Sequence, residues 1–156
     1  MAETNNTAQT ENPAQKAADR EITLTFVIPC YNSEDYMDAC ISSMIGAGED
    51  TEIIVVNDGS KDHTGAKADK WAQAMPDKIR VIHQENAGHG GAVMAGLQAA
   101  RGHYFKVVDS DDWLDRVGLN LLMSKLRTFL AHNERVDLVV CNYVYAVSYT
   151  HLRAHE

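Results

Sequence analysis

Three carboxylates fall within four residues in the stretch Asp109-Ser-Asp-Asp112. Like charges held this close repel one another, and burying them without a partner costs several kcal/mol. A divalent cation removes that penalty, and carboxylate oxygens that leave room for phosphate oxygens suit Mg²⁺ or Mn²⁺. The alternative is a solvated acidic turn that caps the following helix. The mostly apolar run Phe105–Val108 before the cluster and the aromatic Trp113 after it favour metal binding.

A further carboxylate, Asp58, lies in the stretch Val55-Val-Asn-Asp-Gly-Ser60. One interpretation is a tight turn in which Gly59 takes the strained backbone position and Ser60 caps a helix. The other is a ligand contact, because a carboxylate beyond a strand can accept hydrogen bonds from a nucleobase N–H or a ribose hydroxyl. The two roles are compatible, and the residues alone leave both open.

A glycine-rich stretch, Asn86-Ala-Gly-His-Gly-Gly91, enters a predicted helix. Backbone amides at a helix N-terminus can receive a phosphate, and glycine permits close approach. The stretch does not match the phosphate-binding pattern G-x-x-x-x-G-K-[ST], so we favour close packing of the helix as the reason for its glycines. We interpret His89 as a capping or surface residue. Tyr31 and Trp113 are predicted at the rim of the cleft, where aromatic rings can stack on a base or sugar.

The elements that must position these residues alternate regularly between strand and helix. Short apolar runs predict five strands, and the segments between them have helical spacing, with Asn32 or Ser33 as the predicted cap of the first helix and Glu34 in its first turn. The predicted strands are 24–29, 52–56, 79–82, 104–108 and 136–141. This alternation predicts an α/β fold with a mostly parallel sheet and helices on both faces. Ligands of such sheets bind beyond the carboxyl ends of the strands, where Asp58 and Asp109 are placed.

Composition narrows the class of partner and the compartment. The formal net charge is −8, which disfavours nucleic acid as a partner. The three cysteines form no CxxC pair and are predicted to be reduced thiols of a cytoplasmic protein, with a place at the inner face of a membrane left open for a longer protein. Residues 1–20 are predicted to be a disordered leader, residues 21–147 the folded domain, and residues 148–156 a non-native tail.

Four motifs in this order resemble the inverting glycosyltransferases of family 2, which have the GT-A fold. They are Val27-Ile-Pro-Cys-Tyr-Asn-Ser-Glu34, Val55-Val-Asn-Asp-Gly-Ser60, Asn86-x-Gly88 and Val107-Val-Asp-Ser-Asp-Asp-Trp-Leu114. The resemblance covers roughly residues 22–147 and implies the Rossmann-like, nucleotide-sugar-binding half of that fold.

The resemblance also implies roles for individual residues. Pro29, Tyr31 and Glu34 would line the nucleotide pocket, and Asp58 would contact the uracil or ribose. Asp109 and Asp111 would form the D-x-D motif that grips a nucleotide sugar, expected to be a UDP-sugar, through Mg²⁺ or Mn²⁺. The acceptor would be a hydroxyl group of a glycan, a lipid-linked sugar or another molecule.

Two departures from the family pattern limit these expectations. Family members often carry Arg-Asn where this chain has Val93-Met94, and the general base normally follows the fifth predicted strand, where this chain ends. The general base therefore stays unassigned, and we predict little or no transferase activity for the chain alone, with association through exposed sheet surface. The alternatives are a non-catalytic nucleotide-binding fragment and a sugar-phosphate nucleotidyltransferase. The latter is disfavoured because the loop Pro29–Glu34 has neither glycine nor positive charge.

Overall fold

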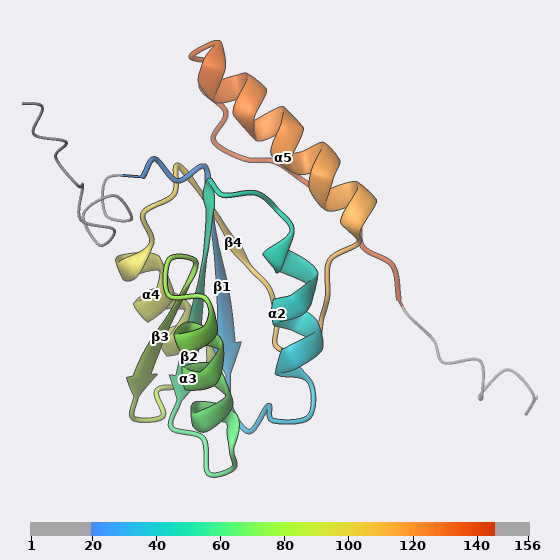
Figure 1. Cartoon of the computed structure of the whole chain (residues 1–156). Helices are drawn as coiled ribbons and strands as arrows, with labels where there is room; N and C mark the ends of the chain where they lie inside the picture. The colour runs from blue at the N-terminus through green and yellow to red at the C-terminus, as the bar shows by residue number, and fades with distance from the viewer. Residues whose placement is uncertain (1–19, 146–156) are drawn as a thin grey trace, which may run out of the picture.

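The computed structural model describes residues 20–145, so the predicted tail and all of the predicted leader except Arg20 lie outside the described residues. Strands and helices alternate along this part of the chain (Figure 1). The strands are β1 (Leu24–Cys30), β2 (Thr51–Asp58), β3 (Ile79–Gln84) and β4 (Tyr104–Val107). The helices are α2 (Met37–Ile45), α3 (Thr64–Ala74), α4 (Gly88–Ala99) and α5 (Arg116–Ala131).

The strands form one parallel sheet in the order β3-β2-β1-β4. The chain moves outward from β1 to β3 and then returns to the other side of β1, where Val27 pairs with Val107 of β4. The order therefore reverses between β1 and β4. In open parallel sheets the crevice beyond the carboxyl ends of the strands at such a reversal is the usual ligand site. The predicted α/β fold is confirmed.

Each face of the sheet is covered by helices, which explains why most of β1 and the centre of β2, Ile53–Val56, are apolar. On one face, Phe26 and Ile28 pack with residues of α2, α3 and α5. On the other face, Val27 and Ile54 pack against α4. The approach of α4 is so close that a Cβ added to Gly96 would lie 2.3 Å from the Val27 side chain.

The fifth predicted strand is not present. Residues 136–141 have no strand or helix in the structure, and Leu138 and Val140 are 79% and 83% exposed. The segment is rich in β-branched residues, but such a pattern gives a strand only where a neighbouring strand pairs with it. In the described part of the chain the sheet ends at β4.

The predicted start of the first helix is also corrected. α2 begins at Met37, and its N-cap residue, Tyr36, makes no side-chain cap. Asn32, with φ 51°, and Ser33 lie in the preceding loop, together with Glu34. The helix starts later because the backbone carbonyl of Ser33 accepts hydrogen bonds from Tyr36 and Met37, which forms a turn ahead of the helix. The predicted end at Gly46 is confirmed.

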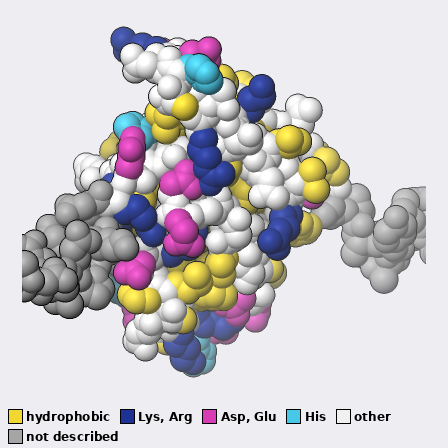
Figure 2. Space-filling view, turned by 45° about the horizontal axis from the view of Figure 1, so that its top comes forward, with side chains coloured by type: hydrophobic (Ala, Val, Ile, Leu, Met, Phe, Trp, Pro, Cys, Tyr) yellow, Lys and Arg dark blue, Asp and Glu magenta, His cyan; other side chains and the backbone are white. Residues whose placement is uncertain are grey.

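Glu52, near the amino end of β2, is a fully buried carboxylate. Its oxygens accept hydrogen bonds from Thr25 Oγ1 (2.8 Å), Arg80 (3.0 Å) and the backbone and side chain of Arg101 (2.7 and 2.9 Å). Burial alone would raise the pKa of Glu52, but these donors and cations lower it. Figure 2, in which this end of the molecule comes forward, shows acidic and basic side chains interspersed over the surface. No helix in residues 20–145 is both long and apolar enough to cross a membrane.

Candidate nucleotide-sugar site

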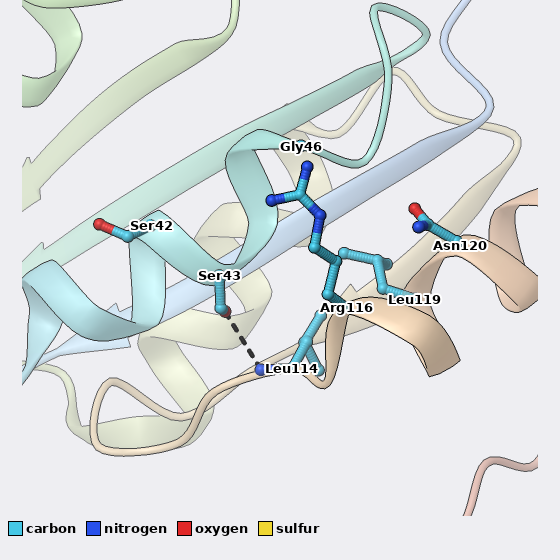
Figure 3. Close-up of a pocket in the computed structure, with 7 residues that line it drawn as sticks. All are labelled: Ser42, Ser43, Gly46, Leu114, Arg116, Leu119 and Asn120. Carbon is cyan, nitrogen blue, oxygen red and sulfur yellow. Dashed lines mark hydrogen bonds between the residues drawn. The ribbon is translucent and has the colours of Figure 1, made fainter.

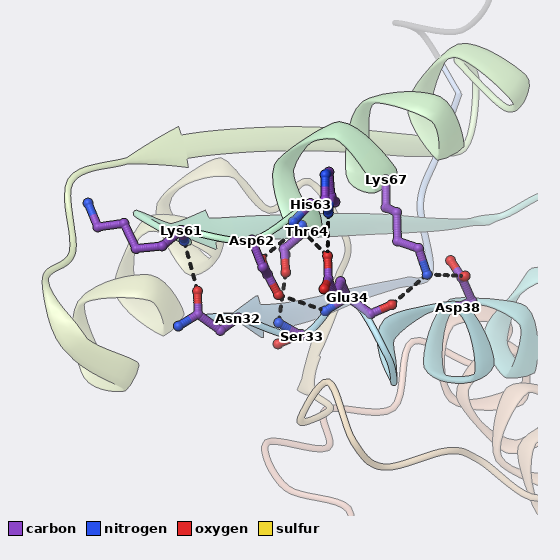
Figure 4. Close-up of polar contacts among 9 residues, drawn as sticks. All are labelled: Asn32, Ser33, Glu34, Asp38, Lys61, Asp62, His63, Thr64 and Lys67. Atoms are coloured by element: carbon purple, nitrogen blue, oxygen red, sulfur yellow. Dashed lines mark hydrogen bonds and ion pairs between the residues drawn. The ribbon is translucent and has the colours of Figure 1, made fainter.

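The loops that follow β1, β2 and β4 meet at the carboxyl end of the sheet, at the lower end of the molecule in Figure 1. Backbone-to-side-chain hydrogen bonds join the first two loops. Asn32 N donates to Ser60 Oγ at 3.1 Å. Lys61 N donates to Asn32 Oδ1 at 2.8 Å (Figure 4). Ser60 therefore ties the loops together and does not cap the helix. The N-cap residue of α3 is His63, which makes no side-chain cap, and Asp62 before it accepts a hydrogen bond from Thr64 N at 2.9 Å.

Glu34 is engaged by the loop after β2. Its Oε2 accepts a hydrogen bond from His63 N at 2.8 Å and lies 2.8 Å from His63 Nδ1, and Glu34 N donates to Asp62 Oδ2 at 3.2 Å (Figure 4). The hydrogen bond from the His63 backbone, followed by the one from its ring, lowers the pKa of Glu34. The Glu34 side chain is 35% exposed, so one side of the carboxylate is open to solvent.

The other two residues predicted to line the pocket after β1 differ in exposure. Pro29 lies inside β1 and is buried. Tyr31 follows the strand and is 51% exposed. Trp113, beyond the acidic cluster, is 58% exposed. Both aromatic rings are accessible at the rim, which is the arrangement that stacking on a ligand requires.

Asp58 is 3% exposed and holds the glycine-rich loop. Its Oδ1 accepts hydrogen bonds from Gln84 Nε2 at 2.7 Å and from Ala87 N at 2.8 Å. Burial alone would raise the pKa of Asp58, but the hydrogen bonds from Ala87 and Gln84 bring it below its ordinary value. The predicted tight turn is confirmed, because Gly59 has φ 68° and an added Cβ would lie 2.8 Å from Asn86 N.

The glycines of the stretch Gly88–Gly91 do not serve close packing against another element, which corrects the expectation above. A Cβ added to Gly88 or Gly90 would have no atom within 4 Å, and Gly88 has φ 77°. At Gly91 the nearest atom is the Cβ of Ala87 in the same loop. α4 instead comes closest to the sheet at Gly96, more than one helical turn after Gly91. The start of α4 therefore presents bare backbone to open space.

The acidic turn after β4 is accessible and meets the start of α4. Asp112 N donates to Asp109 O at 2.9 Å, which closes the turn, and the Asp109 side chain is 54% exposed. Asp111 and Asp112 are exposed as well. His89 Nε2 lies 2.9 Å from Asp109 Oδ1. His89, interpreted from the sequence as a capping or surface residue, is exposed and pairs with Asp109. Its position among glycines at the start of a helix was the sequence signal for this contact.

The side chains present suit a divalent cation that is shared with a ligand. Among residues 20–145 no group of three or more His, Cys, Asp or Glu side chains is gathered in a way that would hold a metal ion. Asp109 and Asp111 are accessible hard oxygen donors on one turn, and such a pair satisfies only part of the coordination shell of Mg²⁺ or Mn²⁺. The remaining ligands would have to come from phosphate oxygens and water.

A small pocket of about 100 Å³ lies elsewhere, between α2 and the start of α5 (Figure 3). Its lining includes Ser43, Gly46 and Arg116, and none of the residues predicted for the nucleotide-sugar site. Ser43 Oγ accepts a hydrogen bond from Leu114 N at 3.1 Å. The pocket therefore marks the packing of the segment after the acidic turn against α2.

Comparisons with known proteins agree with the fold and with the place of the motifs. The family model described as "Glycosyl transferase family 2" matches residues 25–153. An uncharacterized glycosyltransferase of Bacillus subtilis, EpsJ, is 36% identical over 121 residues, which is 77% of this chain and 33% of that protein. Glycosyltransferase GlyA of Streptococcus pneumoniae is 37% identical over 121 residues, 77% of this chain and 16% of that protein.

Among solved structures, S. aureus TarS in complex with UDP-GlcNAc superposes with a TM-score of 0.59 and 25% sequence identity. That match covers 72% of this chain and 32% of the TarS chain. The chain belongs to glycosyl transferase family 2. It spans a third or less of the length of these relatives.

Proposed function

We propose that this chain is the part of a family 2 glycosyltransferase that binds the nucleotide-sugar donor, expected to be a UDP-sugar. The protein would transfer the sugar to an acceptor hydroxyl, on a glycan, a lipid-linked sugar or another molecule, with inversion at the anomeric carbon. The observation that carries the proposal is the meeting of the loops after β1, β2 and β4 at the point where the strand order reverses, with Asp109 and Asp111 exposed there.

In this proposal the nucleoside lies between the loops after β1 and β2. Tyr31 offers an accessible ring and Glu34 a partly exposed carboxylate, while Pro29 shapes the floor. Asp58 would contact the uracil or ribose with the oxygen that does not hold the glycine-rich loop. The bare backbone at the start of α4 gives the diphosphate room to approach.

The diphosphate would reach Asp109 and Asp111 through Mg²⁺ or Mn²⁺. A cation bound there would neutralise the charge that develops on the leaving nucleoside diphosphate. This requirement follows from charge, because a protein with net charge −8 and an acidic turn at its ligand site repels a free diphosphate. The two aspartates would hold the donor. The general base and the residues that bind the acceptor stay unassigned.

The proposal extends to the boundaries and setting of the domain. Residues 21–147 would form the donor-binding domain, with residues 1–20 as a leader and residues 148–156 as a non-native tail. The protein would act in the cytoplasm. A full-length protein that contains this domain would also be able to associate with the inner face of the membrane. Exposed apolar side chains of α5 and the segment after it, such as Leu121 and Val140, would favour self-association of the chain alone.

Calorimetric titration with UDP, with and without Mn²⁺, tests this function. Binding is expected to strengthen by at least about tenfold with Mn²⁺, which corresponds to about 1.4 kcal/mol. Asp111→Ala should abolish that gain, because it removes one of the two proposed ligands. Asp112→Ala is the matched control, since it removes the same charge from the same exposed turn but lies outside the D-x-D motif.

The outcomes separate the classes of function. Equal loss of the Mn²⁺ gain in both variants would show a general charge effect and would overturn the assignment of Asp109 and Asp111. Preference for a nucleoside triphosphate over UDP would favour a sugar-phosphate nucleotidyltransferase. UDP binding of equal strength with and without Mn²⁺ would favour a non-catalytic nucleotide-binding module.

A further inference from the structure

Ser33, in the loop after β1, is a buried polar residue whose hydrogen-bonding groups are all paired. It is 3% exposed. Its N–H donates to Thr64 Oγ1 at 2.7 Å, and its carbonyl accepts from Tyr36 N and Met37 N at 3.1 Å each. Its hydroxyl lies 2.8 Å from the hydroxyl of Ser110. Ser33 therefore contacts three segments: its own loop, the start of α3 and the acidic turn after β4.

Ser110 is the middle residue of the proposed metal-binding motif, between Asp109 and Asp111. Its hydroxyl bonds to the hydroxyl of Ser33 across the point where the strand order reverses. A second bond supports the same turn from the same side, where the thiol of Cys40 donates to Asp109 O at 3.4 Å. The acidic turn is therefore hydrogen-bonded both to the loop after β1 and to α2.

We propose that Ser33 is a positioning residue that joins the metal-binding turn to the nucleotide-binding loops. The inference rests on the function proposed above. Through the bond between Ser33 and Ser110, the binding of a divalent cation at Asp109 and Asp111 and the binding of a nucleoside diphosphate strengthen each other. Without that bond the acidic turn is held to the loop after β1 less firmly, and each ligand loses part of the benefit of the order that the other has imposed.

The physical reason lies in the arrangement of the bonds. The loop after β1 is already tied to the loop after β2 by Asn32 and Glu34, so these two loops form one unit. The acidic turn belongs to a different unit, β4 and α5, on the other side of the sheet reversal. Side-chain bonds from Ser33 and Cys40 connect the units next to the carboxylates. Hydrogen-bond networks of this kind carry energetic coupling between two sites.

The test measures the Mn²⁺-dependent gain in UDP affinity by calorimetry and, separately, the affinity for Mn²⁺ alone from the electron paramagnetic resonance signal of the free ion. Ser33→Ala removes only the hydroxyl and leaves both backbone connections of Ser33 in place. It is expected to reduce the Mn²⁺ gain about fivefold, within the usual range of coupling between sites. UDP affinity without metal should stay unchanged.

Ser110→Ala removes the other hydroxyl of the bond at a less buried position. If Ser33→Ala unfolds the chain, Ser110→Ala still tests whether the bond couples the two ligands. The double variant should lose no more of the gain than either single variant, because both remove the same bond. Ser110→Thr keeps a hydroxyl and should retain the gain. Ser42→Ala, an exposed serine on α2, is the matched control and should behave as the unsubstituted chain.

Three results would overturn the inference. The first is an unchanged Mn²⁺ gain in Ser33→Ala and Ser110→Ala, which would leave the proposed function intact. The second is additive loss in the double variant, which would mean that the two hydroxyls act separately. The third is absence of any Mn²⁺ gain in the unsubstituted chain, which would remove the metal-dependent function and this inference together.

Discussion

The imidazole Nε2 of His89 lies 2.9 Å from Oδ1 of Asp109. This contact joins the first turn of α4 to the acidic turn after β4, although the two residues are 20 positions apart. Carboxylates that bind metals are themselves hydrogen-bonded, and their partners hold them in the orientation that the metal requires. In the proposed metal site, His89 would therefore orient Asp109, a role that its exposure alone did not indicate.

We expect His89→Ala to weaken Mn²⁺-dependent UDP binding about tenfold, because Asp109 loses its orienting partner. Calorimetry with and without Mn²⁺ measures the effect. His83→Ala is the matched control, since His83 Nε2 also pairs with an exposed carboxylate, Asp69 Oδ1, at 3.0 Å, but on the far strand of the sheet. Unchanged or tighter binding in His89→Ala would show that the histidine competes with the cation instead of supporting it.

Asp58→Ala is expected to lower the free energy of unfolding by about 1 kcal/mol, because Gln84 Nε2 and Ala87 N lose the acceptor of their part-buried hydrogen bonds. Urea unfolding followed by circular dichroism measures the change. Gln84→Ala removes only one of the two donors that Asp58 Oδ1 receives and should cost less. If the two variants cost the same, the bond to Ala87 N contributes little to stability.

Gly96→Ala is expected to destabilise the fold by about 1–3 kcal/mol through overpacking, because the new Cβ would lie 2.3 Å from Val27 Cγ1. Gly90→Ala makes the same chemical change in the same helix, where an added Cβ meets nothing within 4 Å. It should leave stability unchanged or raise it by up to about 1 kcal/mol, since alanine favours helix over glycine. Thermal and urea unfolding of the pair compare the two positions directly. Equal effects would contradict the close approach of α4 to β1.

The pair formed by Asp50 and Arg127 predicts a pH dependence of stability. Arg127 donates to both Asp50 oxygens, at 2.9 and 2.5 Å, and these bonds lower the pKa of Asp50 from 3.8 to about 2. A folded-state pKa below the unfolded value stabilises the protein above the unfolded pKa, and the contribution disappears as the pH falls through the folded pKa. We therefore expect the pair to contribute about 1 kcal/mol near neutral pH, since solvent screens this accessible pair, and to lose that contribution between about pH 4 and pH 2.

Urea unfolding of the unsubstituted chain and of Arg127→Met, at several pH values down to about pH 3, measures this contribution. The difference in unfolding free energy should be largest above about pH 5 and should narrow as the pH falls. A difference that stays constant over this range would mean that Arg127 stabilises the chain through its bond to Ala47 O and its packing, with no part for the charge of Asp50.

The cysteines should differ sharply in reactivity. Cys30 and Cys40 are buried, and burial raises the pKa of each thiol to about 12, whereas Cys141 is exposed. Because the thiolate is the nucleophile, a disulfide reagent such as DTNB should modify one thiol rapidly in the folded chain and all three in denaturant. Cys141→Ser should abolish the rapid phase. Rapid modification of a second thiol in that variant would contradict the burial of α2 against β1.

Local patterns in the sequence determined the alternation of strands and helices and the place of each motif at a strand end. Apolar runs such as Ile53–Val56 are buried on both faces of a parallel sheet, so their pattern already indicates their environment. Gly46 ends α2, and Gly59 follows β2 with φ 68°, where its conformational freedom is used. The β-branched run at 136–141 shows the limit of this reasoning, because a strand also needs a neighbour to pair with, and no local pattern supplies one.

Only the tertiary structure decided which loops share a site. Ser33 and Ser110 are 77 positions apart, and they bond because β4 pairs with β1 and not with β3. The same strand order brings His89 to Asp109 and assigns the close helix packing to Gly96. Propensities and spacing act over a few residues, whereas strand order depends on how whole helices and strands bury their apolar surfaces together, which is a property of the complete fold.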